Sequence, residues 1–198
     1  VEWVLGNNRQ KTAPFILSSH DEETGALLAT NAYSIDYSGN FAVFASDSSK
    51  AGYSTSRREF IGRHGSVVKP KSAAAGANLS GSIEQDGDPC AALSQDLTLA
   101  PGEEKSVLFY LGDADSADAA KALVKDIRAT DFDATVKANR DFWNDFTGRL
   151  QVETPDKAFN HMVNRWLPYQ ALSCRLMART AFYQSSGAFG FRDQLQDT

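Results

Sequence analysis

At 198 residues, the chain has room for one large domain or two small ones. Its composition, 42% hydrophobic and 23% charged, is typical of a soluble globular protein. The net charge of −5 and the lack of a basic run argue against nucleic acid as a main partner. No stretch is apolar over the roughly 18 residues that a spanning helix needs. We therefore expect no direct membrane contact from this segment.

The cysteines and histidines are too few and too scattered to form a disulfide framework or a structural metal site. Cys90 and Cys174 are far apart, which favours a reducing compartment, and we expect a cytoplasmic location. The three histidines do not cluster, so we expect no metal and no bound cofactor. The first residues, Val1–Gly6, lack both a signal-peptide pattern and an initiator Met. We expect a piece of a longer protein.

The first part of the chain has the sequence pattern of antiparallel β-structure. Short apolar runs separated by Gly, Pro, Asp and Ser predict strands. The expected strands cover Ala13–Ser19, Ala26–Thr30, Phe41–Ala45 and, at a sheet edge, Ser54–Ile61. A turn at Asp21–Gly25 joins the first two, with Gly25 able to adopt a positive φ. These features predict an antiparallel sandwich over residues 1–113.

The strongest strand pattern lies in Leu93–Leu111. Leu97 and Leu99 alternate with polar residues before a Pro-Gly turn, and the alternation resumes from Val107 to Leu111. Period-two alternation on both sides of a turn predicts a hairpin with one buried face.

Helical periodicity replaces the strands after residue 113. Ala119–Ala129 carries apolar residues on one face, and Asp133–Phe146 carries a broad aromatic stripe that Gly148 ends. A third helix is predicted to start with Thr154 as N-cap and Pro155 in the first turn. Strands followed by helices indicate separate domains.

The third helix contains Pro168, which predicts a kink or the end of its first half. Tyr169–Ala181 continues as an apolar helix, which favours burial inside a helical array. Core packing is the favoured interpretation of Trp166 and Tyr169 near the kink.

The densest group of polar and aromatic residues is Phe182–Asp197. Arg192 offers a fixed fork of donors and Asp193 accepts from neighbouring hydroxyls, while the nearby aromatic faces suit a pyranose ring. The plainer alternative is a loop held by an Arg–Asp ion pair. Asp193 and Asp197 are too closely spaced for the acid and base of an inverting glycosidase. We interpret them as sugar ligands.

Two stretches, Asn164–Arg175 and Phe182–Asp197, together resemble glycoside hydrolase family 94, in particular its members that act on β-1,2-glucans. Three stretches in the front half resemble the same region: Glu2–Gly6, Arg57–Arg63 and Asp88–Leu93. The resemblance covers essentially the whole chain.

The resemblance implies a multi-domain α+β fragment. Residues 1–113 would be the C-terminal part of an N-terminal antiparallel β-sandwich, and residues 114–153 a helical linker. Residues 154–198 would form the first helices of an (α/α)6 catalytic barrel.

The resemblance also implies an inverting phosphorylase or glycosyltransferase of β-1,2-glucans. Inorganic phosphate is then the co-substrate: it attacks the anomeric carbon, an Asp general acid protonates the leaving oxygen, and α-glucose 1-phosphate forms. Arg192 and Asp193 would hold the non-reducing-end glucose beside the cleaved bond, with Asp197 and Gln184 as weaker ligands. The general acid is expected beyond Thr198, so we expect the fragment alone to be inactive.

The alternative function is a non-catalytic carbohydrate-binding or structural module. An exposed row of aromatic residues on one sheet face would favour it, and a face covered by the Ala119–Phe146 helices would count against it. Homodimer contacts through the sandwich, and anchoring of the parent protein in a bacterial inner membrane, are further expectations from the resemblance.

Overall fold

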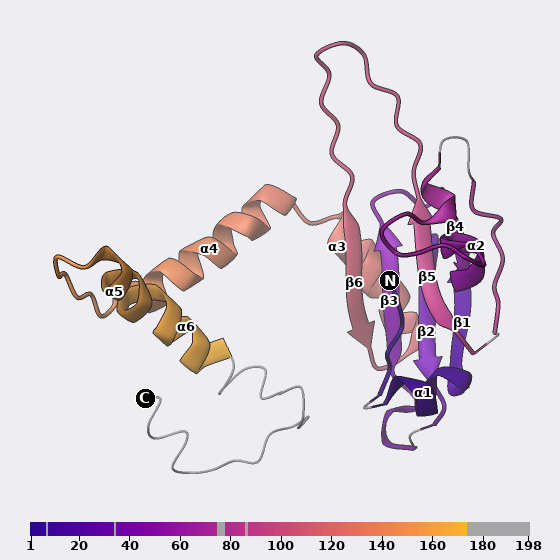
Figure 1. Cartoon of the computed structure of the whole chain (residues 1–198), viewed down its shortest axis with the longest axis horizontal. Helices are drawn as coiled ribbons and strands as arrows, with labels where there is room; N and C mark the ends of the chain where they lie inside the picture. The colour runs from indigo at the N-terminus through magenta and orange to yellow at the C-terminus, as the bar shows by residue number, and fades with distance from the viewer. Residues whose placement is uncertain (7, 34, 75–77, 86, 174–198) are drawn as a thin grey trace. The chain divides into compact units, whose positions relative to one another are not determined.

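The computed structural model describes residues 1–6, 8–33, 35–74, 78–85 and 87–173. The chain divides into two compact units, Val1–Ala129 and Thr130–Thr198, and each is described by itself. The first unit holds the strands and the described part of the second is helical (Figure 1). This order agrees with the predicted α+β class. The assignment of helices in the second unit to an (α/α)6 barrel stays a prediction.

A four-stranded antiparallel sheet forms the centre of the first unit. Its strands pair in the order β1-β2-β3-β6. They are β1 (Ile16–Asp21), β2 (Ala26–Asn31), β3 (Phe41–Ser46) and β6 (Phe109–Ala114). The first three confirm the strands predicted from the apolar runs, with shifts of a few residues at their ends.

The turn between β1 and β2 is held by its own side chains. The Asp21 carboxylate accepts hydrogen bonds from the Thr24 N–H (2.9 Å) and the Thr24 hydroxyl (2.6 Å). Gly25 has φ 67°, as predicted, and a Cβ there would lie 2.4 Å from the Ser49 carbonyl oxygen. Glycine is required because both the positive φ and the close backbone approach exclude a side chain.

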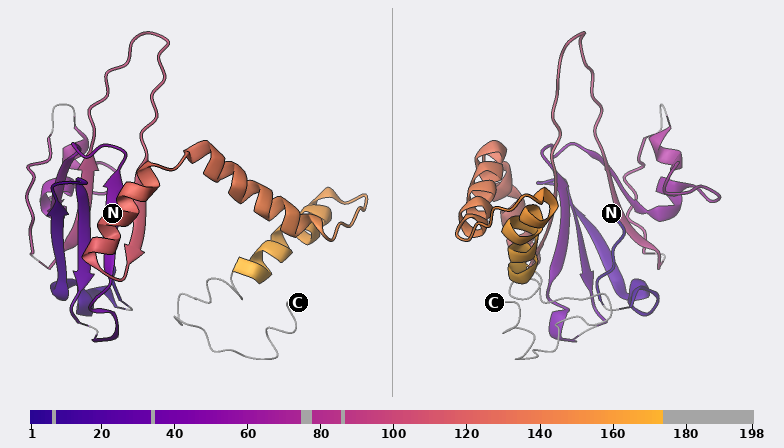
Figure 2. Two further views of the ribbon diagram at one scale, coloured as in Figure 1. Left: turned by 180° about the vertical axis from the view of Figure 1, so that it is seen from behind. Right: turned by 60° about the vertical axis from the view of Figure 1, so that its left-hand side comes forward.

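A smaller two-stranded sheet consists of β4 (Gly52–Ser56) and β5 (Pro89–Ser94), which pair antiparallel. The N-terminal segment lies along β5, where Glu2 forms a β-bridge with Cys90. The two sheets form separate layers, and the helix α3 (Ala117–Arg128) covers the opposite side of the larger one (Figures 1 and 2).

The larger sheet is buried on both faces at its centre. Leu27 and Leu28 of β2 are neighbours that point to opposite faces, and both are buried. Leu28 belongs to the cluster that packs on α3, which comprises Ala26, Leu28, Val43, Ala45, Ala120 and Val124. Leu27 belongs to the cluster between the sheets, which comprises Trp3, Ile16, Leu27, Ala29 and Ala91. A one-residue slip of β2 would exchange these two sets of side chains between the clusters.

The prediction of a Leu93–Leu111 hairpin is wrong. β5 ends at Ser94 and pairs with β4, whereas β6 begins at Phe109 and pairs with β3. The residues between them form a loop that extends beyond the sheets (Figure 1), and Leu97 and Leu99 are about half exposed. Alternation produces a strand only where a partner and a covering layer exist, and the described chain supplies neither to this loop.

The predicted strand Ser54–Ile61 is half wrong, because β4 ends at Ser56 and the helix α2 (Arg57–Ile61) follows. The Ser56 hydroxyl caps this helix by accepting a hydrogen bond from the Glu59 N–H (3.1 Å). Ser-x-x-Glu is the pattern of a capping box, so the sequence contained a signal that the strand prediction overlooked.

The remaining helices of the first unit are short, apart from α3. They are α1 (Arg9–Thr12) and the 3-10 turns η1 (Ala13–Phe15), η2 (Ile35–Tyr37) and η3 (Lys71–Ala73). The helix α3 confirms the predicted amphipathic helix. Its Arg128 side chain donates hydrogen bonds to the carbonyl oxygens of Ser46 and Thr24, which ties its C-terminus to the sheet unit.

The second unit contains α4 (Phe132–Gly148), α5 (Lys157–His161), the π-helical η4 (Met162–Trp166) and α6 (Leu167–Gln170). The helix α4 confirms the prediction, including its end at Gly148. The predicted cap at Thr154 is wrong: Asp156 caps α5, because its carboxylate accepts from the Ala158 and Phe159 N–H groups. The predicted helix Tyr169–Ala181 is described only as far as Ser173.

Within the described ranges, no helix has the length and apolar character to cross a membrane. Among the same residues, no group of three or more His, Cys, Asp and Glu side chains is placed to hold a metal ion.

Candidate functional site

The four predicted sugar ligands, Gln184, Arg192, Asp193 and Asp197, lie outside the described residues. The structure therefore leaves their positions as predictions. It does describe the helical segment that leads toward them, from α5 to Ser173, and three polar clusters on the first unit.

Two asparagines four residues apart hold the start of that helical segment. The Asn164 side chain accepts from the Val152 N–H and donates to the Val152 carbonyl oxygen, both at 2.8 Å. Asn160 makes the same pair of bonds with Thr154, both at 2.9 Å. Residues at i and i+4 share a helix face, while residues at i and i+2 share an edge of an extended chain. The two amides thus act as rungs of a ladder, which we call the Asn160–Asn164 ladder.

The helical hydrogen bonding changes just before Pro168, near the position where a kink was predicted. The Leu167 N–H donates to the Met162 carbonyl oxygen, five residues back, at the end of the π-helical η4. Proline has no N–H to donate and its ring crowds the carbonyl four residues earlier, here that of Asn164. A π-helical turn before the proline accommodates this loss.

Aromatic rings connect α4 with α6 inside the second unit. Trp143 and Tyr169 have ring centroids 4.8 Å apart, and Trp166 lies 6.1 Å from Tyr169. Arg165 donates from its guanidinium to the Asn144 amide oxygen (2.8 Å) and the Thr147 hydroxyl (3.2 Å). These contacts favour the packing role that the sequence predicted for Trp166 and Tyr169, although both rings are still 40–48% exposed.

On the first unit, three separate stretches with family resemblance meet in one cluster of charges. Glu2 accepts from Arg9 (2.7 Å) and Arg57 (2.5 Å), and Asp88 accepts from the same two guanidinium groups (3.0 and 3.4 Å). Hydrogen bonds from Arg57 and then from Arg9 lower the pKa of Glu2. This cluster of four charged side chains, which we call the charge ring, joins the N-terminal segment to α1, α2 and the start of β5. Because its members are about one-third to one-half exposed, we assign it a positioning role with a small energy.

A second cluster centres on the Glu59 carboxylate, which accepts four hydrogen bonds. The donors are the hydroxyls of Ser54 (2.5 Å), Ser80 (2.9 Å) and Ser82 (3.1 Å) and the N–H of Ser80 (2.7 Å). Burial acts to raise the pKa of Glu59, but these hydrogen bonds outweigh it and the pKa is lowered. The cluster fastens residues 80–82 to α2.

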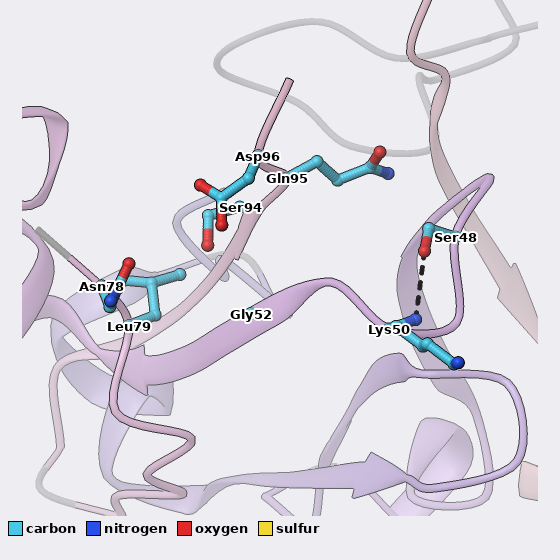
Figure 3. A pocket seen from close by; sticks show the side chains of 8 residues that line it. All are labelled: Ser48, Lys50, Gly52, Asn78, Leu79, Ser94, Gln95 and Asp96. Atoms are coloured by element: carbon cyan, nitrogen blue, oxygen red, sulfur yellow. Dashed lines mark hydrogen bonds between the residues drawn. The ribbon is translucent and has the colours of Figure 1, made fainter. Parts of the chain in front are cut away.

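A polar pocket of about 440 Å³ lies where β4 begins and β5 ends (Figure 3). We call it the β4–β5 pocket. It is lined by Ser48, Lys50, Gly52, Asn78, Leu79, Ser94, Gln95 and Asp96. Along the end of β5, the Ser94 and Asp96 side chains lie on one side and Gln95 extends the other way, toward its hydrogen bond with Asp47 (2.7 Å) (Figure 3). Leu79 is its one apolar lining side chain, so the pocket suits a ligand rich in hydroxyl groups.

The comparisons with known proteins identify the family. The family model described as "Glycosyl hydrolase 94, supersandwich domain" matches residues 1–130. The chain belongs to glycosyl hydrolase family 94. The model described as "Glycosyl hydrolase 94 superfamily, catalytic domain" matches residues 142–198 of this family member, so the stretch with Arg192 and Asp193 falls in the catalytic-domain match. The resemblance stated from the sequence is confirmed.

Curated relatives of this family 94 chain include synthases and phosphorylases. It is 60% identical over 197 residues to "Cyclic beta-(1,2)-glucan synthase NdvB" of Rhizobium meliloti (strain 1021), covering 100% of this chain and 7% of that protein. It is 34% identical to "Solabiose phosphorylase" of Paenibacillus borealis, over 79% of this chain and 20% of that one. It is 27% identical to "N,N'-diacetylchitobiose phosphorylase" of Vibrio proteolyticus, over 83% and 21%. The chain thus spans about a fifth or less of these relatives.

Sequence reasoning missed the Asn160–Asn164 ladder, the partners of Glu59 and the β4–β5 pocket. A signal existed only for the ladder: two asparagines at i and i+4 follow an extended segment. The other two combine segments far apart in the chain, so nothing local indicates them.

Proposed function

We propose that the chain is part of an inverting carbohydrate phosphorylase or glycosyltransferase that acts on β-1,2-glucans. The observation that carries this proposal is the 60% identity to a cyclic β-(1,2)-glucan synthase along the whole chain. The phosphorylase names of the more distant relatives support the reaction type. The linkage rests on the first relative alone.

In the proposed mechanism, Arg192 and Asp193 bind the glucose at the non-reducing end, beside the bond that is cleaved. The guanidinium donates to sugar oxygens and the carboxylate accepts from sugar hydroxyls, which together fix the ring. Inorganic phosphate then attacks the anomeric carbon while a general-acid Asp protonates the leaving oxygen. Asp197 and Gln184 support the same subsite.

We propose that the phosphate ligands and the general acid come from other parts of the longer protein. The small share of each relative that the chain covers supports this. The 198-residue chain alone is then expected to release no glucose 1-phosphate from a β-1,2-glucan and phosphate. Release of that product by the purified chain would contradict the proposal.

We propose that the helices α5 to α6, which precede the subsite residues in the chain, support the proposed subsite. The Asn160–Asn164 ladder anchors their first turns, and the Trp143–Tyr169 contact anchors their end on α4. We propose that residues 154–198 begin an (α/α)6 barrel, after a sandwich segment at 1–113 and a linker at 114–153. Within the stretch assigned to the linker, α3 packs on the larger sheet and belongs to the first compact unit.

The decisive experiment is substitution at the subsite in the full-length parent enzyme. Hydrogen bonds to charged groups contribute about 1.5–3 kcal/mol each, so Arg192→Ala and Asp193→Ala should each lower kcat/KM at least about tenfold. Arg140→Ala, which removes an exposed guanidinium from α4, is the matched control and should leave turnover unchanged. Near-normal phosphorolysis in both subsite variants would refute the assignment.

We also propose a cytoplasmic location for this segment. We further propose homodimer contacts through the sandwich of the parent protein, and light scattering of that protein would test these contacts. The alternative, a non-catalytic binding or structural module, is weakened because α3 covers one face of the larger sheet.

A further inference from the structure

The β4–β5 pocket belongs to the first compact unit, whereas the proposed glucose subsite belongs to the second. Its wall comes from three segments: residues 48–52, residues 78–79 and residues 94–96. Its volume of about 440 Å³ lies within the roughly 300–1,000 Å³ of small-ligand sites. It therefore has room for a ligand that the proposed function does not account for.

Four polar side chains that line the pocket are exposed to solvent. Gln95 is engaged with Asp47, but four others bond to no residue of the described ranges: the ammonium of Lys50, the amide of Asn78, the hydroxyl of Ser94 and the carboxylate of Asp96. Together they offer both donors and acceptors from three segments.

Gly52 leaves the centre of this arrangement open. It pairs with Ser94 across the β4–β5 ladder, and a Cβ at this position would lie 2.6 Å from the Ser94 hydroxyl oxygen. A side chain at position 52 would therefore displace the Ser94 hydroxyl and extend into the space beside it. The φ of Gly52 is not in the left-handed region, so its backbone does not require glycine.

The charges of the pocket select the class of ligand. Lys50 and Asp96 give one positive and one negative group that form no ion pair with each other. The Lys50 and Asp96 side chains lie on opposite sides of the pocket (Figure 3), so a ligand that contacts both must extend across it. A neutral polyhydroxyl ligand can use both, because each sugar hydroxyl donates and accepts.

We propose that the β4–β5 pocket is a second binding site for a neutral gluco-oligosaccharide. Asp96 accepts from sugar hydroxyls, Lys50 and Asn78 donate to sugar oxygens, and Leu79 contacts an apolar ring face. The choice of a β-1,2-linked glucan rests on the proposed function. The choice of a neutral saccharide rests on the side chains that line the pocket.

Nuclear magnetic resonance of the intact 198-residue chain tests the site. Titration with a β-1,2-linked glucotriose should give saturable shifts at the amides of Gly52, Ser94 and Asp96. Gly52→Val, which fills the pocket, should abolish these shifts. Asp96→Asn should raise the dissociation constant at least about tenfold. This variant keeps the test valid if Gly52→Val fails to fold. Glu104→Gln, an exposed change in the loop after β5, should have no effect.

Two further arms separate this site from the proposed subsite. The pocket shifts should persist in the Arg192→Ala/Asp193→Ala double variant, and their loss there would overturn the proposal of an independent site. If cellotriose shifts the pocket amides and the β-1,2-linked sugar does not, the pocket stands as a saccharide site and only its preference for a β-1,2 linkage fails; the proposed function is then still tested by the Arg192→Ala and Asp193→Ala variants. No pocket shift with either sugar up to about 20 mM, beyond ordinary millimolar binding, would overturn the site.

Discussion

The Asn160–Asn164 ladder predicts a local effect that can be measured at single amides. Asn164→Ala removes two hydrogen bonds of 2.8 Å to the Val152 backbone. At about 0.5–1.5 kcal/mol each, the loss is about 1–3 kcal/mol of local opening free energy. Hydrogen exchange of the Val152 amide should therefore accelerate about 5- to 150-fold.

The exchange of Thr154 serves as an internal reference in the same sample, because its amide bonds to Asn160 and not to Asn164. Asn164→Asp sharpens the test: its carboxylate still accepts from the Val152 N–H but cannot donate to the Val152 carbonyl oxygen. It should protect the Val152 amide better than Asn164→Ala does. Asn139→Ala, the same change at an exposed position of α4, should leave Val152 unaffected. Unchanged Val152 exchange in Asn164→Ala would refute the ladder.

Two further predictions concern the first unit. Gly25→Ala should destabilise it by at least about 2 kcal/mol, because the residue has φ 67° and its Cβ would meet the Ser49 backbone at 2.4 Å; an unchanged denaturation midpoint would contradict this. Glu59 has a folded pKa below its ordinary 4.5, so its contribution is present above about pH 4.5 and lost as the pH falls through the folded value. Glu59→Gln should therefore lower stability at neutral pH and flatten its acid dependence, and parallel pH curves for the two proteins would count against the assigned hydrogen bonds.

Local patterns predicted the regular elements well where one apolar pattern ran through the whole segment. The apolar runs of β1, β2 and β3 and the stripes of α3 and α4 were found, because burial demands those periods whatever the partner. One error lies where two local signals compete. After Ser56, β-forming residues compete with a capping box, and the cap prevails because Ser56 accepts from the Glu59 N–H.

The hairpin error has a different cause. Leu97 and Leu99 alternate like strand residues, but no local rule specifies which sheet a strand joins. The first predicted arm lies mostly in the loop after β5, and the end of the second arm falls in β6 of the larger sheet. Strand partners are chosen by long-range packing, which a period of two does not encode.

The sequence by itself determined the family, the change from strands to helices and the stretch where Arg192 and Asp193 lie, because those depend on residue types at fixed spacing. Only the tertiary structure decided that Glu2, Arg57 and Asp88 share one charge ring, that two asparagines hold the start of the helical segment, and that three segments near the start of β4 and the end of β5 line a polar pocket. The physical reason is the same in each case. Hydrogen bonds and ion pairs between distant segments depend on how hydrophobic burial arranges the layers, and a residue's local sequence does not specify its distant partner.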